Sequence, residues 1–133
     1  MITAEQLQTQ LQQFTGTNFY YQHWFGLRYT DGIKFLANSA KCYWLIDAIA
    51  SYQPQLQQIP MLRQFQLWVF VVGNNHEFIQ PKPENQAVLT CWEDTPKLGI
   101  KPAITQQIPY TDFPLPKLYL YVESQVLLLP SEH

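Results

Sequence analysis

The sequence predicts an α+β domain in which N-terminal helices pack on one face of a C-terminal, mainly antiparallel sheet of three to five strands. Segments with apolar residues at helical spacing gather in the first half, and segments rich in β-branched and aromatic residues gather in the second. The chain has 133 residues, of which 47% are hydrophobic. This length suits one core, so residues 1–133 are expected to form a single domain.

The first predicted helix begins at Thr3. Thr3 and Gln6 have the spacing of a capping box, in which each side chain bonds to a backbone N–H of the other residue. A narrow apolar stripe follows, and Gly16 is the predicted end of the helix. The stripe consists of Leu7, Leu11 and Phe14.

An extended segment and a second helix come next. Over residues 19–29 the odd positions are nearly all apolar or aromatic, and this period of two favours an extended chain that Gly26 could bend. Thr30 or Asp31 can then cap a helix that runs to about Ala40.

The third predicted helix, about residues 40–53, is the most apolar part of the chain and ends before Pro54. At 100° per residue, Trp44 and Asp47 point away from its main apolar stripe. Two interpretations of Asp47 stay open. It faces solvent or bonds to a nearby group, or it is a buried carboxylate with a raised pKa and is then the best acid/base candidate in the chain.

The second half of the chain is predicted to form strands. Between the second and third strands lies a long loop, residues 94–116, which contains five prolines and is a candidate functional element. The expected strands cover residues 64–72, 86–92, 117–123 and 126–129.

Charge and cysteine usage exclude several classes of function. Charged residues make up only 14% of the chain, the formal net charge is −2, and the basic residues are scattered singly, so we expect neither nucleic-acid nor membrane binding. A basic leader and an apolar stretch of membrane-spanning length are both missing, which predicts a cytoplasmic protein. Cys42 and Cys91 lie in apolar segments and are expected to be reduced core residues.

Motifs of known chemistry are missing. The sequence has no G-x-S-x-G, no H-E-x-x-H and no glycine-rich phosphate loop, so we expect no catalytic residue, no metal site and no cofactor. Asp31 and Asp112 both follow a Tyr-Thr pair, and backbone capping is the favoured role for each.

The sequence does hold more aromatic residues than one core is expected to cover. Trp44 lies off the main helical stripe, and Tyr119 and Tyr121 lie on the outer face of their strand. Trp68 and Phe70 are assigned to the second face of the central strand. We therefore expect a small, non-catalytic protein-interaction module that binds a protein partner or self-associates as a homodimer through Trp44, Tyr119 and Tyr121. In the alternative, the proline-rich loop folds over these rings and completes an ordinary core.

A second hypothesis is a small enzyme or ligand-binding domain. Its pocket would lie between the 94–116 loop and the 40–53 helix, and it would use His23, Asp47 and Asp112. This hypothesis requires the three side chains to converge in one cleft.

Four blocks of the sequence, in order and nearly end to end, resemble an uncharacterised bacterial family catalogued only as a domain of unknown function. The blocks are YTDGIKFLA from Tyr29, YWLIDAIASY from Tyr43, IPYTDFPL from Ile108 and LLLPSE from Leu127. The resemblance implies a free-standing small domain, and it implies no activity, cofactor or site.

Overall fold

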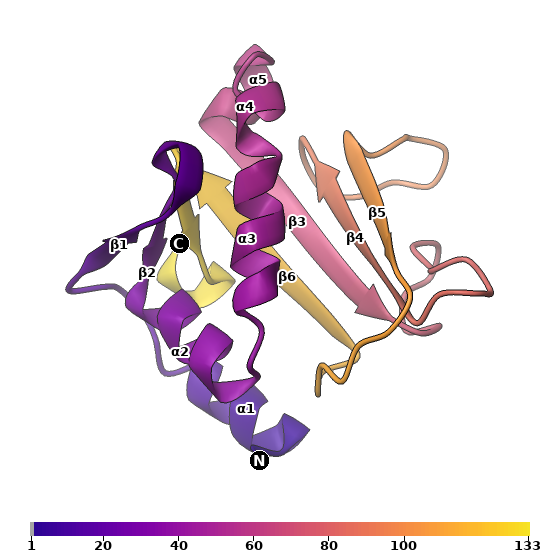
Figure 1. Cartoon of the computed structure of the whole chain (residues 1–133), viewed down its shortest axis with the longest axis horizontal. Helices are drawn as coiled ribbons and strands as arrows, with labels where there is room; N and C mark the ends of the chain where they lie inside the picture. The colour runs from indigo at the N-terminus through magenta and orange to yellow at the C-terminus, as the bar shows by residue number, and fades with distance from the viewer. Residues whose placement is uncertain (1) are drawn as a thin grey trace.

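The computed structural model describes residues 2–133 and shows helices packed against a single seven-stranded sheet (Figure 1). The strand order is β1-β2-β7-β6-β3-β4-β5, and neighbouring strands are antiparallel except for β2 and β7, which are parallel. The helices are α1 (Ala4–Leu11), α2 (Asp31–Ser39), α3 (Tyr43–Ser51), α4 (Gln53–Leu56) and α5 (Pro60–Gln64), with short 3-10 turns η1 (Trp24–Gly26) and η2 (Pro130–Glu132). The strands are β1 (Tyr20–Gln22), β2 (Arg28–Thr30), β3 (Phe65–Val72), β4 (Ala87–Trp92), β5 (Ile104–Ile108), β6 (Lys117–Glu123) and β7 (Val126–Leu128).

The predicted α+β class is confirmed, but the prediction of three to five strands is wrong. The extended segment 19–29 is two strands, because Phe25 and Gly26 both take positive φ and reverse the chain between β1 and β2. A further strand, β5, forms inside the segment 94–116 that was predicted as a loop. The sheet therefore begins in the N-terminal part of the chain.

The helix signals near the N-terminus act as predicted, whereas two helix ends differ. Gln6 N–H donates to Thr3 Oγ1 and Thr3 N–H donates to Gln6 Oε1, each at 3.1 Å, so the capping box is present. The first helix ends at Leu11, before Gly16. The third ends at Ser51, and Pro54 lies in the first turn of α4, where its missing N–H removes no helical bond. None of the helices in residues 2–133 is long and apolar enough to cross a lipid bilayer.

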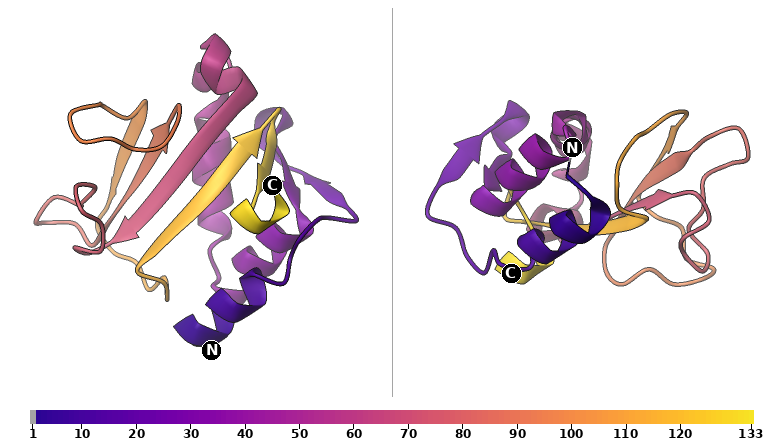
Figure 2. Two further views of the ribbon diagram at one scale, coloured as in Figure 1. Left: turned by 180° about the vertical axis from the view of Figure 1, so that it is seen from behind. Right: turned by 90° about the horizontal axis from the view of Figure 1, so that it is seen from below.

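Each of the five helices contributes buried apolar residues to one core. The helices lie on one face of the central strands, as the two further views show (Figure 2). Trp68 and Phe70 are fully buried in this core, so their assignment to the second face is wrong. The odd-numbered residues of β3 form the second face, where Ile79 and Phe78 from the following loop cover them. Those odd-numbered residues are Phe65, Leu67, Val69 and Val71.

Two buried glutamines join the helices to the central strand. Gln53 at the start of α4 and Gln66 in β3 exchange side-chain hydrogen bonds of 3.0 and 2.9 Å. Trp68 Nε1–H also donates to Gln66 Oε1 at 2.8 Å. Burying an amide without such partners costs about 1–3 kcal/mol, and here each amide is satisfied.

The end of the chain is bonded to the start of α2. Glu132 Oε1 accepts from the Thr30 hydroxyl at 2.6 Å, and Glu132 Oε2 accepts from Gly32 N–H at 3.2 Å. Thr30 is itself the N-cap of α2, since its Oγ1 accepts from Ile33 N–H. A carboxylate in this position is favoured because the first turn of a helix has free N–H groups and a partial positive charge.

The close approach of Glu132 leaves no space for a side chain at Gly32. A Cβ there would lie 2.6 Å from Glu132 Oε1 and 2.6 Å from Leu129 Cδ1. We therefore predict that Gly32→Ala lowers the free energy of unfolding by about 1–3 kcal/mol, as overpacking does. Urea unfolding would measure this loss. Gly16→Ala is the matched control, since no atom lies within 4 Å of its added Cβ, and equal effects of the two substitutions would contradict the role of the Glu132 contact.

Candidate functional site

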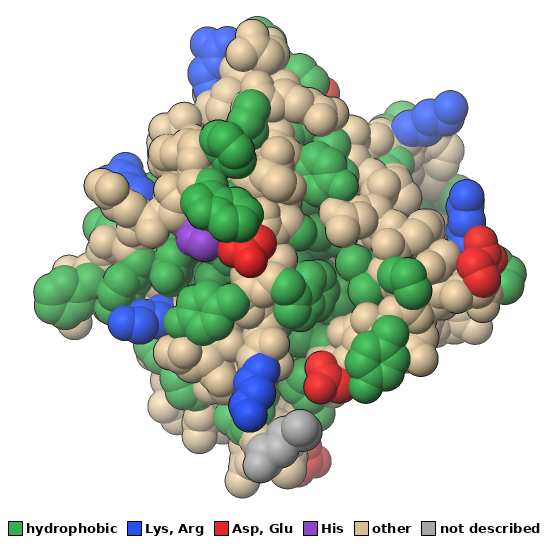
Figure 3. Space-filling model, in the orientation of Figure 1, with side chains coloured by type: hydrophobic (Ala, Val, Ile, Leu, Met, Phe, Trp, Pro, Cys, Tyr) green, Lys and Arg blue, Asp and Glu red, His purple; other side chains and the backbone are tan. Residues whose placement is uncertain are grey.

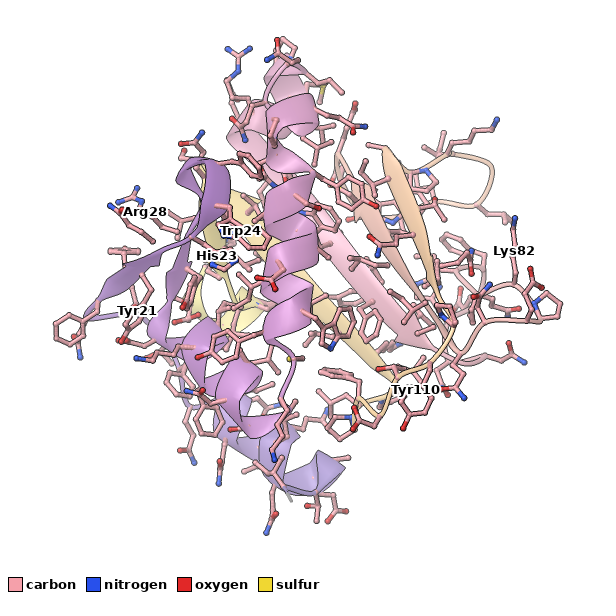
Figure 4. All side chains as sticks on the ribbon, viewed as in Figure 1. Tyr21, His23, Trp24, Arg28, Lys82 and Tyr110 are labelled. Carbon is pink, nitrogen blue, oxygen red and sulfur yellow. The ribbon has the colours of Figure 1, made fainter. Side chains whose placement is uncertain are left out.

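The largest group of exposed aromatic side chains lies on the β1–η1–β2 segment at one edge of the sheet. We call residues 19–29 the aromatic hairpin. Four of its rings are more than half exposed: Phe19 (65%), Tyr20 (55%), Trp24 (54%) and Phe25 (61%). Figure 3 shows hydrophobic side chains on this side of the molecule, and Figure 4 labels Tyr21, His23, Trp24 and Arg28 there.

His23 attaches the tip of the hairpin to α3. Its Nε2 lies 2.7 Å from Asp47 Oδ1, and its ring stacks on Trp24 at 5.0 Å between centroids and 26° between planes. In Figure 3 the purple His and a red carboxylate touch beneath a green side chain, at the place that Figure 4 labels His23 and Trp24. The imidazole thus fixes the orientation of an exposed indole.

Asp47 is accessible to solvent, with 43% of its side chain exposed, whereas the His23 side chain is 18% exposed. Of the two interpretations of Asp47, the structure shows the hydrogen-bonded one. The His23 ring also meets Tyr29 edge-on at 6.1 Å. No hydroxyl or thiol in residues 2–133 is hydrogen-bonded to His23, so the pair as it stands has no nucleophile beside it.

Tyr21 and Asp31 attach the other end of the hairpin to α2. The Tyr21 hydroxyl donates to Asp31 Oδ1, and Asn18 N–H donates to Asp31 Oδ2, both at 2.9 Å. These hydrogen bonds stabilise the carboxylate, and the bond from Asn18 is the main reason why the pKa of Asp31 lies below its ordinary value of 3.8. The same contact with Asp31 raises the pKa of Tyr21 above 10.0.

Two cations lie over rings of the hairpin. The Arg28 guanidinium carbon is 5.5 Å from the centre of the Tyr20 ring, and Lys34 Nζ is 4.4 Å from the centre of the Tyr21 ring. Both distances allow cation–π attraction. The Tyr21 ring also stacks on Tyr29 at 5.3 Å, so Tyr20 and Tyr21 each have a cation over the ring.

Phe25 holds its ring outward at the cost of backbone strain. Its φ of 57° and ψ of 31° are left-handed, a conformation that costs a residue with a Cβ about 1–2 kcal/mol. Strained residues of this kind cluster at binding and active sites. Phe25 is therefore an exposed apolar ring in a backbone position that suits Gly or Asn better.

The residues that the sequence nominated are dispersed. His23 and Asp47 are in contact, whereas Asp112 lines a different hollow of about 180 Å³ beside Lys41 at the end of α2. Trp44 is half-buried and meets Phe70 edge-on at 5.5 Å. The structure therefore brings together two of the three groups that the ligand-pocket hypothesis requires.

Tyr119 and Tyr121 lie on the outer face of β6, in different surroundings. Tyr119 is partly exposed and lines an open hollow of about 370 Å³ between α1 and the C-terminal segment. Tyr121 packs against Phe65 and His133, at 5.3 and 5.0 Å between ring centres. No contact in residues 2–133 joins Trp44, Tyr119 and Tyr121 into one patch.

The four exposed rings of the aromatic hairpin were not among the residues predicted from the sequence to form a site. The signal that could have found them is that aromatic residues occupy both even and odd positions between Phe19 and Phe25. A strand with rings on both faces needs cover on both faces. The two three-residue strands β1 and β2 are not covered on both faces, because each contains exposed residues.

The two cysteines and the possible metal ligands are not arranged for catalysis or metal binding in the described part of the chain. Burial raises the pKa of the Cys42 thiol to about 12 and raises that of Cys91 further, so neither is a thiolate near neutral pH. Across the described part of the chain, no three His, Cys, Asp or Glu side chains lie close enough to hold one metal ion.

The comparison with protein families agrees with the resemblance seen in the sequence. The model of DUF6876, described as a family of unknown function, matches residues 5–133. The chain belongs to this family. The match covers nearly the whole chain and confirms the predicted membership of an uncharacterised family. No curated protein and no solved structure matches the chain.

The contact between Tyr21 and Asp31 predicts linked titrations. Tyr21→Phe should raise the pKa of Asp31 toward 3.8, and Asp31→Asn should lower the pKa of Tyr21 toward 10.0. Carboxyl-carbon NMR and ultraviolet absorbance measure the two values. Because the folded pKa of Asp31 is lowered, its stabilising effect is complete above pH 3.8 and disappears as the pH falls through the folded pKa. Titrations that do not respond to either substitution would contradict the hydrogen bond.

The strain at Phe25 predicts a substitution that does not harm the fold. Phe25→Asn should leave the free energy of unfolding unchanged or raise it by up to about 1 kcal/mol, because Asn adopts the left-handed conformation more readily. Chemical denaturation measures the change. Phe19→Asn is the control, since Phe19 is equally exposed but has no positive φ. A loss at position 25 above about 1 kcal/mol would show that the Phe25 ring stabilises the fold.

Proposed function

We propose that this protein is a protein-interaction module whose contact surface is the aromatic hairpin. The observation that carries the proposal is the concentration of four largely exposed rings within residues 19–25, on a domain whose other rings mostly pack into its cores. Single exposed apolar residues are normal on a surface, but several exposed rings within one short segment indicate a candidate contact surface. Tyr43, the first residue of α3, is a further partly exposed ring of this kind.

The hydrogen bonds that hold the hairpin favour binding with little loss of conformational entropy. The bond between His23 and Asp47 fixes the tip of the hairpin, and the bond between Tyr21 and Asp31 fixes its base. Aromatic side chains have few rotatable bonds, so a contact area built from them loses little freedom when a partner arrives. The left-handed Phe25 supports the same function, since it keeps an apolar ring outward at an energetic cost.

The proposed surface differs from the one expected from the sequence. Trp44, Tyr119 and Tyr121 are separated and partly covered, so the proposal places binding at Trp24 and Phe25. The expected class of function, a non-catalytic module that recognises protein, is unchanged. Cytoplasmic localisation is part of the same proposal and depends on the sequence features described above.

Selection of peptide ligands tests this proposal. Peptides would be selected from a random library on the immobilised protein, and their affinities measured for wild type, Trp24→Ala and Tyr110→Ala. Loss of an interface anchor costs about 2 kcal/mol or more, so Trp24→Ala should weaken binding about thirtyfold. Tyr110→Ala is the matched control, because Tyr110 is 72% exposed and lies outside the hairpin.

Circular dichroism would confirm that both variants are folded. If the selected ligands bind Trp24→Ala as tightly as wild type, the hairpin is not the contact surface. If the affinity of the ligands depends on Tyr119 or Tyr121 instead, the contact surface is the outer face of β6, as expected from the sequence.

A further inference from the structure

The edge strand β1 has backbone groups that no neighbour uses. β1 pairs only with β2, and His23 N–H donates to Leu27 C=O at 2.8 Å across that pair. Bonded and non-bonded pairs alternate in an antiparallel ladder, so the next pair, Gln22 with Arg28, is non-bonded. Accordingly, Arg28 N–H points away from β1 and donates to Gln125 C=O at 2.9 Å.

It follows that the backbone of Gln22, and of Tyr20 two residues earlier, faces outward from the sheet. Each residue offers one N–H donor and one C=O acceptor along the free edge. Tyr20 and Gln22 are also exposed, so this part of β1 lies at the surface of the domain. The edge can therefore accept a short extended segment.

Two cations beside this edge, Arg28 and Lys34, have no carboxylate partner in the described part of the chain. Across residues 2–133, neither Arg28 nor Lys34 lies within 4.0 Å of a carboxylate oxygen. The nearby carboxylates keep their charges but are hydrogen-bonded within the domain, Asp31 to Asn18 and Tyr21, and Asp47 to His23. The cations lie over Tyr20 and Tyr21, which face opposite sides of β1 because adjacent side chains of a strand alternate.

We propose that the hairpin binds an extended, acidic segment of a partner protein, which adds to the sheet as a strand beside β1. This inference rests on the proposed function and specifies its partner. The added strand would bond to the backbone of Tyr20 and Gln22. Its carboxylates on one face would meet Arg28, and those on the other face would meet Lys34.

A second copy of this chain fits the edge less well. Pairing of β1 with its own copy would bring two Arg28 and two Lys34 side chains to one seam, where the nearby carboxylates are engaged within each copy. Like charges facing each other across strands are destabilising. Charge complementarity therefore favours an acidic partner over self-association.

Titration with a designed peptide tests the proposal. The probe is a capped ten-residue peptide of alternating Glu and Val, added to isotope-labelled protein while backbone amide shifts are recorded by NMR. We expect saturable shifts centred on the amides of Tyr20 and Gln22, and weaker binding as salt screens the charges. Arg28→Gln should weaken binding about tenfold, whereas Arg63→Gln, the other arginine of the chain, should not.

Two further peptides separate charge from strand addition. A peptide of alternating Lys and Val should not bind, and a Glu-Val peptide with alternate backbone nitrogens methylated should lose the shifts because it cannot form the ladder. Equal binding of either peptide, shifts centred on β5 at the opposite edge, or no saturable shift would overturn the proposal. Concentration-dependent dimerisation that uses β1 would overturn it in favour of a second copy.

This titration can fail separately from the proposed function. If library-selected peptides depend on Trp24 but the acidic probe does not bind, the aromatic hairpin remains an interaction surface and only the acidic, extended partner is wrong. If neither kind of peptide depends on the hairpin, both proposals are wrong.

Discussion

The carboxylate of Glu132 at the first turn of α2 is the contact on which the arrangement of this domain depends. It joins residues separated by 100 positions, and it does so beside the one parallel pair of the sheet, β2 with β7. Gly32 suits this position because an added Cβ would enter the space that the Glu132 and Leu129 side chains occupy. This contact holds β2 beside β7, and β2 thereby joins β1 to the strands that come from the second half of the chain.

The position of β2 decides where the aromatic hairpin lies. β1 pairs with the sheet through β2, so the hairpin lies at the edge of the fold and its four exposed rings lie outside the main core. Hydrogen bonds to Asp47 of α3 and to Asp31 of α2 hold it at two points. The exposed rings are therefore held on a backbone that is already ordered. Binding to such a surface loses little conformational entropy.

Local signals in the sequence predicted local structure well. The capping box of Thr3 and Gln6, the cap at Thr30 and the alternation along β6 were all predictable, because each depends on residues within a few positions. The second strand of the hairpin was not, because the reversal at Phe25 requires a left-handed conformation that an aromatic residue rarely adopts.

Long-range contacts account for most of what the sequence could not predict. The bonds from Gln53 to Gln66 and from Glu132 to Gly32 depend on the tertiary fold. His23 and Asp47 were both nominated, but their contact across 24 positions became visible only in the structure. The burial of Trp68 and Phe70 also depends on which face of β3 the helices cover, and periodicity alone does not determine that face.

If the aromatic hairpin is a binding surface, Trp24 must be an ordered, solvent-facing ring, and fluorine NMR of the protein labelled with 5-fluorotryptophan measures this. Of the four tryptophans, Trp24 alone is more than half exposed. The account predicts that its resonance alone shows a large solvent isotope shift, which disappears when a ligand binds, while the Trp44, Trp68 and Trp92 resonances change little. A Trp24 resonance without that shift, or a ligand that moves only the other three, would contradict the account.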